Sequence, residues 1–199
     1  YYRVRAYNAI TISGYSSEQN ATTLSNVPVA PSGLTITTLQ SNRIIIAWTD
    51  NSNNETGFKV QRKGATGAYA DIGTTGANVT TYTDNDTALT DGTLYYYRVC
   101  ATNTAGDSAY SNEVNGITPL LIPTGLTATA ISSSQISLTW TDNSSSESGY
   151  KIEQSPVDDL HFSEIATVGP NITAYSDTGL SEGTKYYYRV RAYNAIVLL

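Results

Sequence analysis

The sequence predicts an all-β protein built from β-sandwiches in tandem. Serine and threonine together account for 50 of the 199 residues, tyrosine outnumbers phenylalanine by 16 to 2, and methionine is absent. This composition favours strands over helices, because β-branched and aromatic side chains pack well on a pleated sheet. Several segments alternate apolar and polar residues with a period of two, and the chain repeats itself at intervals of about 92 residues.

Two kinds of repeat define the domain organisation. The segment Trp48–Ser52 recurs as Trp140–Ser144, and Gly57–Val60 recurs in similar form as Gly149–Ile152, so one structural unit spans about 92 residues. A longer match is the decapeptide YYRVRAYNAI, which is identical at residues 1–10 and 187–196. We therefore expect a super-repeat of two domains, in which the second decapeptide starts a further copy.

The alternating segments are typical of antiparallel strands with one buried and one solvated face. In residues 43–49, for example, Ile44, Ile46 and Trp48 share one face. Runs rich in Asp, Asn and Gly separate the segments at intervals of about 8–12 residues, which predicts roughly seven short strands and a β-sandwich. The other segments that alternate are 136–141, Phe58 to Val60, Tyr150 to Ile152, and Tyr95 to Ala101.

Further motifs identify the type of sandwich. Each unit begins with Pro-x-x-Leu, carries one tryptophan in an early strand, and places a leucine shortly before the sequence Tyr-x-Tyr-Arg-Val. With these motifs the chain resembles tandem fibronectin type III domains, of the variety found in secreted and surface proteins of bacteria. The resemblance implies an immunoglobulin-like fold of two sheets, a last strand at Ser108–Glu113, and a tyrosine corner in each unit. It also implies a structural core that includes Trp48, Trp140, Tyr95, Tyr186, Leu89 and Leu180.

The strand order predicts where the domains begin and end. We expect residues 28–119 to form a complete domain, residues 1–27 to supply strands F and G of a preceding or neighbouring domain, and residues 120–199 to supply strands A to F with strand G missing. An unpaired strand edge is a template for another chain. Residues 11–27 of one copy could therefore complete the open 120–199 domain of another by strand addition. The interpretation that we favour is a longer covalent tandem array.

Charge and composition exclude several classes of function. The net charge is −6, with 17 acidic against 11 basic residues, which argues against nucleic acid as a partner. No apolar stretch approaches the 18 residues of a membrane span. With one cysteine, Cys100, and one histidine, His161, the sequence predicts no catalytic residue and no cofactor.

The acidic turns are weak candidates for calcium. Asp50 with Glu55, and Asp142 with Glu147, lie in oxygen-rich loops that follow the tryptophan strands. The spacing does not match an EF-hand, which needs glycine at the sixth position of its loop and an acid at the twelfth. The simpler interpretation is a turn whose side chains bond their own backbone.

Arginine and tyrosine alternate on the solvent face of the strand that holds Tyr-x-Tyr-Arg-Val. Such a face is either a contact surface or a cross-strand ladder. The interface candidates are Tyr96, Arg98, Tyr187, Arg189, Arg191, Tyr193, Tyr1, Arg3 and Arg5.

Together these features predict a non-enzymatic structural or interaction protein, located outside the cell or on its surface. The main hypothesis is a repeat unit of a fibre or surface stalk that assembles head to tail. The alternative hypothesis is a spacer, or a carbohydrate- or protein-binding module, of a larger secreted enzyme or adhesin.

Overall fold

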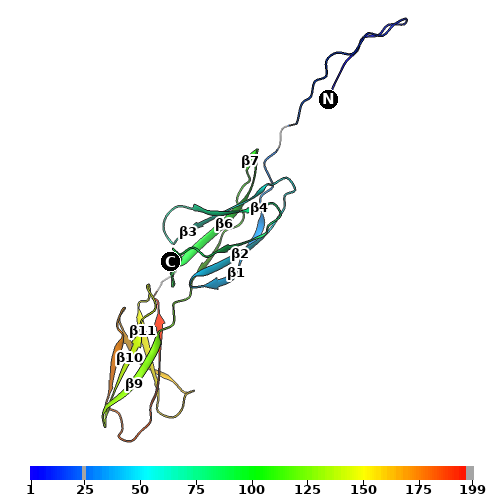
Figure 1. Cartoon of the computed structure of the whole chain (residues 1–199). Helices are drawn as coiled ribbons and strands as arrows, with labels where there is room; N and C mark the ends of the chain where they lie inside the picture. Colours follow the sequence, from blue (N-terminus) through cyan, green and yellow to red (C-terminus); the bar gives the residue numbers. More distant parts are fainter. Residues whose placement is uncertain (24–25, 196–199) are drawn as a thin grey trace.

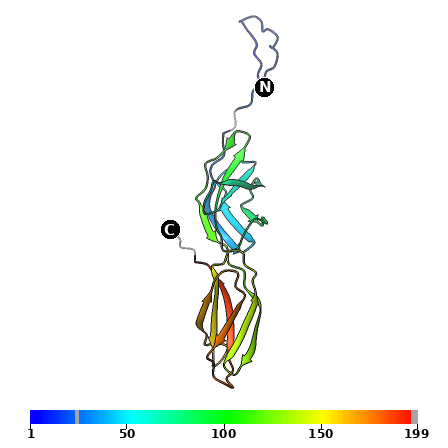
Figure 2. The ribbon, with the colours of Figure 1, turned by 90° about the vertical axis from the view of Figure 1, so that its left-hand side faces the viewer.

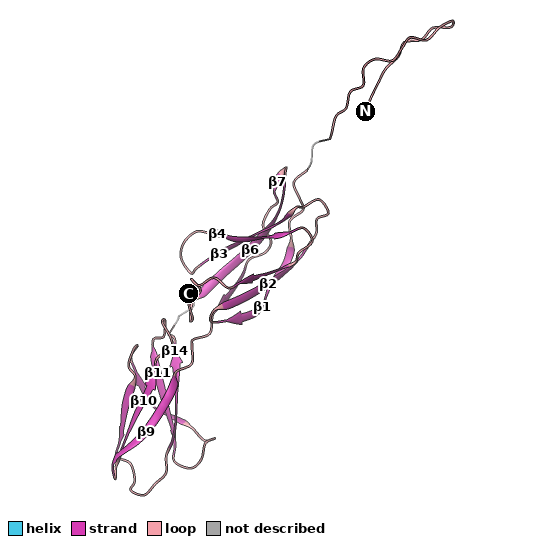
Figure 3. Cartoon of the chain, viewed as in Figure 1, coloured by secondary structure: helices cyan, strands magenta, loops and turns pink. Residues whose placement is uncertain are grey.

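The computed structural model describes residues 1–23 and 26–195 and contains two β-sandwiches arranged end to end (Figures 1 and 2). A long hairpin formed by residues 1–20 extends beyond the first sandwich, on the side opposite the second. All regular structure in these residues is strand, which confirms the all-β prediction (Figure 3). No helix that could cross a membrane occurs in the described part of the chain.

The first domain packs a sheet of three strands against a larger sheet. Strands β1, β2 and β5 form the smaller sheet in the order β1-β2-β5, and the larger sheet has the order β4-β3-β6-β7, with β8 also paired to β6. The strands are β1 (Ser32–Gln40), β2 (Arg43–Thr49), β3 (Gly57–Lys63), β4 (Ala70–Gly76), β5 (Thr81–Asp84), β6 (Leu94–Asn103), β7 (Gly106–Asp107) and β8 (Val114–Ile117).

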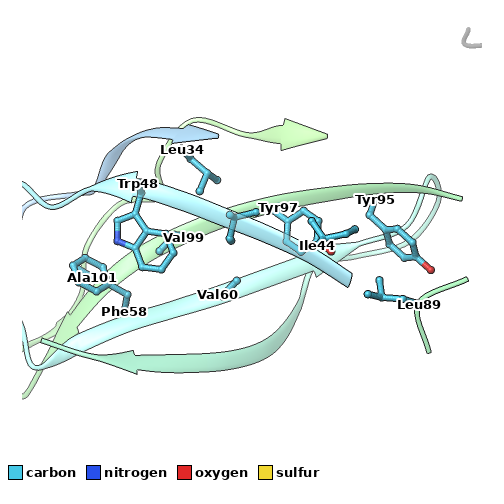
Figure 4. Close-up of a cluster of buried hydrophobic side chains, with 11 residues drawn as sticks. Leu34, Ile44, Trp48, Phe58, Val60, Leu89, Tyr95, Tyr97, Val99 and Ala101 are labelled. Atoms are coloured by element: carbon cyan, nitrogen blue, oxygen red, sulfur yellow. The ribbon is translucent and has the colours of Figure 1, made fainter. Parts of the chain in front are cut away.

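The core of this domain lies between the two sheets, as the alternation in the sequence predicts (Figure 4). Trp48 of β2 meets Phe58 of β3 edge to face, with ring centroids 5.4 Å apart. At the other end of the core, Leu89 and Tyr95 are buried together, and the Tyr95 hydroxyl accepts a hydrogen bond from the Thr90 amide at 3.0 Å. This is the tyrosine corner that ties the crossing between the sheets to β6.

The second domain repeats this plan with two sheets of three strands, β13-β10-β9 and β12-β11-β14. Trp140 meets Tyr150 edge to face at 5.5 Å, which reproduces the Trp48–Phe58 contact. The strands are β9 (Thr124–Ser132), β10 (Gln135–Thr141), β11 (Gly149–Ser155), β12 (Ser163–Val168), β13 (Ala174–Thr178) and β14 (Tyr187–Tyr193).

The two cores differ in how well they are covered. Leu34 of β1 is 2% exposed, whereas its counterpart Leu126 of β9 is 36% exposed. In the first domain the Asn112 side chain bonds both the amide and the carbonyl of Leu34, at 2.9 Å each. The described residues of the second domain contain no counterpart of the segment 108–117. Leu180 is half-buried there, so the predicted core is looser at this position than at Leu89.

Tyr186 is likewise half-buried, unlike Tyr95, although its hydroxyl still accepts a hydrogen bond from the Ser181 amide at 3.0 Å. The tyrosine corner is therefore present in both domains, and its burial differs.

The segment Ser108–Glu113 differs from the regular strand that the resemblance implies. Its backbone amides donate to β6, from Ser108 to the Ala101 carbonyl and from Ser111 to the Val99 carbonyl, at 2.8 Å each. In the return direction, the amides of Ala101 and Val99 bond the hydroxyls of Ser108 and Ser111 at 2.9 and 3.1 Å. Side-chain oxygens thus replace carbonyls as acceptors, and the ladder is interrupted between β7 and β8.

The hairpin of residues 1–20 has the same bonding pattern as β6 with its returning segment. Its isolated bridges join Tyr2 with Gln19 and Tyr7 with Ile12, as Tyr97 pairs with Val114 and Thr102 with Asp107 in the first domain. The hairpin is exposed along its whole length. In the second copy of the decapeptide, residues 187–193 form β14, while Ile196 and the divergent residues Val197–Leu199 lie outside the described residues.

Candidate functional site at the domain joint

The two domains meet at a turn of the first domain and a loop of the second. The turn Asp91–Gly92 precedes β6, and the loop Ser144–Ser146 connects β10 with β11. The covalent linker, residues 118–123, passes beside this contact. Asp91 is only 4% exposed, although it belongs to a turn at the end of its own domain.

Five groups donate hydrogen bonds to the Asp91 carboxylate. The Ser144 hydroxyl donates at 2.5 Å and the Ser145 hydroxyl at 3.0 Å. The backbone amides of Ser145 and Leu121 donate at 3.3 and 3.1 Å. The fifth donor is the Ser146 hydroxyl, which lies 3.3 Å from the Asp91 carboxylate and also donates to the Asp91 backbone carbonyl. One carboxylate thereby joins its own domain, the linker and the neighbouring domain.

The charged form of Asp91 is the form that these donors stabilise. Burial alone would raise the pKa of the carboxyl group, but the hydrogen bonds from Ser144, the Leu121 amide and Ser145 outweigh it, so the pKa lies below its ordinary value. An uncharged carboxyl group would carry its own proton and would accept these bonds less strongly.

Gly92 allows the close approach of the two domains. Its φ of +59° is in the left-handed region, and a Cβ atom at this position would lie 2.6 Å from the Ser146 hydroxyl and 2.7 Å from Leu120. The Asn194 side-chain amide donates to the Gly92 carbonyl at 3.3 Å and to the Ser146 carbonyl at 3.0 Å. The joint therefore also involves the residue that follows β14.

Neither half of this joint is repeated elsewhere with the same chemistry. The position that corresponds to Asp91 in the second domain is Glu182, which is exposed. The loop that corresponds to Ser144–Ser146 is Ser52–Asn54, whose Asn54 side chain donates to the Asn26 carbonyl at 2.9 Å. In the sequence, Asp91 belongs to one of the runs rich in Asp, Asn and Gly that separate the predicted strands, which gives it no role beyond the turn. One difference in the sequence could have pointed to the joint: the loop has serines at 145 and 146 in the second domain, where the first domain has asparagines at 53 and 54.

The predicted Tyr–Arg face of the first domain forms a stack of cations and rings. Arg98 lies over Tyr69 at 4.0 Å and over Tyr110 at 3.7 Å, and Lys63 lies between Tyr69 and Tyr96 at 4.8 and 4.7 Å. The Tyr69 hydroxyl also donates to the Glu113 carboxylate. Tyr69 and Tyr110 were not among the predicted residues of this face: Tyr69 lies just before β4, and Tyr110 lies in the segment that was expected to form the last strand. Within the stack Lys63 lies 3.8 Å from Glu113, and the Arg98 Nε donates to the Gln61 side-chain oxygen at 2.8 Å.

In the second domain the corresponding arginines share a carboxylate. Arg189 and Arg191 bond Glu153 through their Nε atoms at 2.5 and 3.1 Å, and Arg189 also lies over the Phe162 ring at 4.3 Å. The Lys185 ammonium lies 4.5 Å from the centre of the Tyr187 ring, and the Lys151 ammonium lies 5.5 Å from the centre of the Tyr193 ring.

In the hairpin, Arg3 and Arg5 lie over the Tyr15 ring at 3.8 and 5.0 Å, and Arg3 is 3.8 Å from Glu18. Tyr1 is exposed.

The acidic loops use their carboxylates to hold neighbouring turns. Asp50 and Asp142 each accept a hydrogen bond from the amide two residues later at 2.9 Å. Glu55 and Glu147 accept from the amides of Asn78 and Asn171, at 3.3 and 3.0 Å. Both asparagines have a positive φ, so each glutamate stabilises a strained turn. Within residues 1–23 and 26–195, no three His, Cys, Asp or Glu side chains gather to hold a metal ion.

Cys100 and His161 are outside the joint and differ in exposure. Cys100 is 1% exposed, and burial raises the pKa of its thiol. The exposed His161 ring nitrogen Nδ1 lies 2.7 Å from Asp158 in the same loop.

Comparisons with known proteins agree with this architecture. The sequence profile of the fibronectin type III domain matches residues 29–117 and 121–197. A two-domain fibronectin type III segment of chicken tenascin superposes with a TM-score of 0.71 at 16% identity, covering 83% of this chain and 91% of that chain, which is a likeness of fold.

Two bacterial proteins are similar in sequence. Exoglucanase B of Cellulomonas fimi is 34% identical over 96% of the chain, and chitinase A1 of Niallia circulans is 28% identical over 84% of it. The chain spans 18% of the length of the exoglucanase and 24% of the length of the chitinase. The two sandwiches, their tyrosine corners and the profile match show that the chain belongs to the fibronectin type III family, as two domains in tandem.

Proposed function

We propose that the chain is a non-catalytic spacer within a larger secreted protein, and that it holds the parts on either side of it at a fixed distance and orientation. The observation that carries the proposal is the Asp91 joint. A linker alone leaves two domains free to turn, whereas a buried carboxylate with five donors restrains their relative orientation.

The similarity to bacterial proteins named as an exoglucanase and a chitinase supports this proposal over a self-assembling fibre. Both names refer to enzymes that cleave polysaccharides, and such polymeric substrates are found outside the cell. The matched region is a small part of each enzyme, so their catalytic activity belongs to other parts of those chains. We therefore place the protein outside the cell, in company with a polysaccharide-degrading activity.

Small-angle X-ray scattering of the 199-residue chain tests the spacer. The wild-type chain should scatter as one elongated body of fixed shape, and Asp91→Ala should broaden the distribution of distances because the second domain turns about its linker. Glu182→Ala is the matched control, since Glu182 occupies the corresponding position and is exposed. A wild-type profile that already requires an ensemble of orientations, or an Asp91→Ala profile equal to that of the control, would contradict the proposal.

Asp91→Asn adds a more conservative variant. Its amide keeps one acceptor oxygen but lacks the charge, so the joint should loosen less than in Asp91→Ala. Melting of each variant, followed by tryptophan fluorescence, shows whether both domains remain folded.

A repeat unit of a fibre or surface stalk is the second candidate function. The observation that favours it is the decapeptide that is identical at residues 1–10 and 187–196. The sequence of the full gene distinguishes the two candidates, because a fibre predicts further copies of this two-domain unit and a spacer predicts a catalytic domain nearby.

A further inference from the structure

One carboxylate oxygen in the first domain is buried without a hydrogen-bond partner. Glu55 lies in the loop between β2 and β3 and is 8% exposed. Its Oε1 atom accepts a hydrogen bond from the Asn78 amide at 3.3 Å. Its Oε2 atom has no partner, and it is the only such oxygen among the buried side chains that the structure describes. A buried charge without a partner is costly, so we expect this oxygen to bind a proton donor or a cation.

The neighbour of Glu55 in this loop is a second acid, Asp50. The pKa of Glu55 is lowered from its ordinary value, first by a hydrogen bond from its own backbone amide and further by the side chains of Ser52 and Asp50, although burial opposes the shift. A hydrogen bond between two carboxyl groups needs a proton between them, because a carboxylate can only accept. A metal ion can take the place of that proton and lets both groups remain charged.

The second domain fills the corresponding space with a hydroxyl group. Tyr150 stands where the first domain has Phe58 (Figure 4), and each ring meets the tryptophan of its own domain edge to face. The Tyr150 hydroxyl donates to the Asp142 carboxylate. Burial and this hydrogen bond raise the pKa of Tyr150, and the charge of Glu147 adds to the effect, so the hydroxyl lies near both acids. Because Phe58 has no hydroxyl, the first domain has the two acids without this donor.

The loop of the first domain offers oxygen atoms of the kind that calcium binds. Asp50 uses its Oδ1 atom to accept the Ser52 amide at 2.9 Å. The Ser52 hydroxyl donates to the Asn54 side-chain oxygen at 2.8 Å, and its own oxygen keeps a lone pair for a cation. Calcium accepts carboxylate, neutral protein and water oxygens in flexible geometry, whereas magnesium demands a regular octahedron. Two carboxylates with neutral oxygens therefore favour calcium.

We propose that the first domain binds one calcium ion between Asp50 and Glu55, and that the Tyr150 hydroxyl takes the place of such an ion in the second domain. The Ser52 hydroxyl and water complete the coordination. With only two carboxylates the site should be weak, with a dissociation constant of about 10⁻⁴–10⁻³ M, as in extracellular modules. This inference is independent of the spacer function.

The ion would stiffen a loop that also contacts the chain where it enters the domain. The Asn54 side chain donates to the Asn26 carbonyl at 2.9 Å, and the Asn103 side chain donates to the same carbonyl at 2.9 Å. Because Ser52 bonds Asn54, an ion held by Asp50, Ser52 and Glu55 restrains this contact as well. Calcium should therefore raise the melting temperature of the first domain.

Terbium luminescence tests the site, since Tb³⁺ occupies calcium sites and is excited through a nearby indole ring. Trp48 and Trp140 lie two residues before Asp50 and Asp142, so each loop has its own sensitiser. The wild-type chain should bind one Tb³⁺ ion, and Ca²⁺ should displace it. Glu55→Gln keeps the shape of the side chain and should weaken binding about 10–100-fold. Glu147→Gln is the matched control and should leave binding unchanged.

Exchange of the two rings tests why one domain binds and the other does not. Phe58→Tyr should weaken binding as strongly as Glu55→Gln, and Tyr150→Phe should create a second site, so that the chain binds two ions. Each substitution installs the residue that the other domain carries at the same place, and melting in the presence of a chelator checks that both variants fold.

Four results would overturn the inference. They are a wild-type chain that binds no Tb³⁺, bound Tb³⁺ that Ca²⁺ does not displace, a Glu147→Gln variant that weakens binding as much as Glu55→Gln, and a Phe58→Tyr variant that binds as tightly as the wild type. A Tyr150→Phe chain that still binds a single ion overturns the role assigned to the hydroxyl group.

Discussion

Replacing Arg62 by leucine or by glutamine tests how each domain satisfies a buried carboxylate at the same place in the fold. In the first domain Arg62 bonds Asp84, which is 2% exposed, at 2.7 Å, and the Tyr97 hydroxyl donates to the same oxygen at 2.7 Å. In the second domain the corresponding acid, Asp177, accepts hydrogen bonds from the Gln154 side-chain amide at 2.5 Å and from the Tyr188 hydroxyl at 2.7 Å. The buried carboxylate is therefore paired with a charged arginine in the first domain and with a neutral glutamine in the second.

The expected losses in the free energy of unfolding differ between the two variants. Arg62→Leu removes the positive charge that pairs with Asp84, so that the Tyr97 hydroxyl is left as the side-chain donor to this oxygen. Leaving a buried carboxylate without its charged partner costs about 3 kcal/mol of the free energy of unfolding. Arg62→Gln restores the donor that the second domain uses and gives up the charge, at a cost of about 1 kcal/mol. The difference corresponds to a melting point roughly 8–16 °C lower for the leucine variant of this small domain.

Urea unfolding followed by fluorescence measures these losses. Trp140→Phe in the background leaves Trp48 as the single reporter of the first domain. Lys59→Leu on the same strand is the control, because its ion pair with Asp107 is exposed to solvent and should contribute little to the free energy of unfolding. The reasoning is refuted if Arg62→Gln loses as much stability as Arg62→Leu, or if Arg62→Leu loses no more than the lysine control.

Three further predictions follow from other contacts. Gly149→Ala should destabilise the second domain by about 3 kcal/mol or more in urea unfolding, since the new Cβ would lie 2.0 Å from the Val168 carbonyl oxygen at a φ of +147°; Gly169→Ala, with open space around it, should change little. Cys100 should react with a thiol reagent far more slowly in the native protein than in urea, because burial hides the thiol and raises its pKa, and rapid native labelling would contradict this. Asp91 has a lowered pKa, so its contribution to the joint should be present above the ordinary aspartate pKa of about 3.9 and disappear as the pH falls through the lower value in the folded protein; scattering at acidic and neutral pH, with Asp91→Ala as the reference that should show no such change, measures this.

Local patterns in the sequence predict the sandwich and most of its core. The alternation in residues 43–49 places Trp48 correctly between the sheets, and the 92-residue repeat places Trp140 in the same way. These features depend on neighbours within one strand, so a period of two is sufficient to find them.

The parts that sequence reasoning missed depend on contacts between distant segments. The donors to Asp91 include serines more than fifty residues away, and no periodicity within a strand points to them. Tyr69 joins the stack around Arg98 from a loop, where alternation gives no information. The segment 108–113 has strand-like composition, but the hydroxyls of Ser108 and Ser111 accept the bonds that a ladder would have made.

The joint between the domains also determines which motions one domain can impose on the other. A polypeptide linker transmits tension along its length, but it lets one end swivel relative to the other. The Asp91 carboxylate and the Asn194 side chain add attachments away from that axis, one to the loop Ser144–Ser146 and one to Gly92. Under the proposed spacer function we expect these added points of attachment to resist swivelling, so that a twist applied to one domain is transmitted to the other as torque.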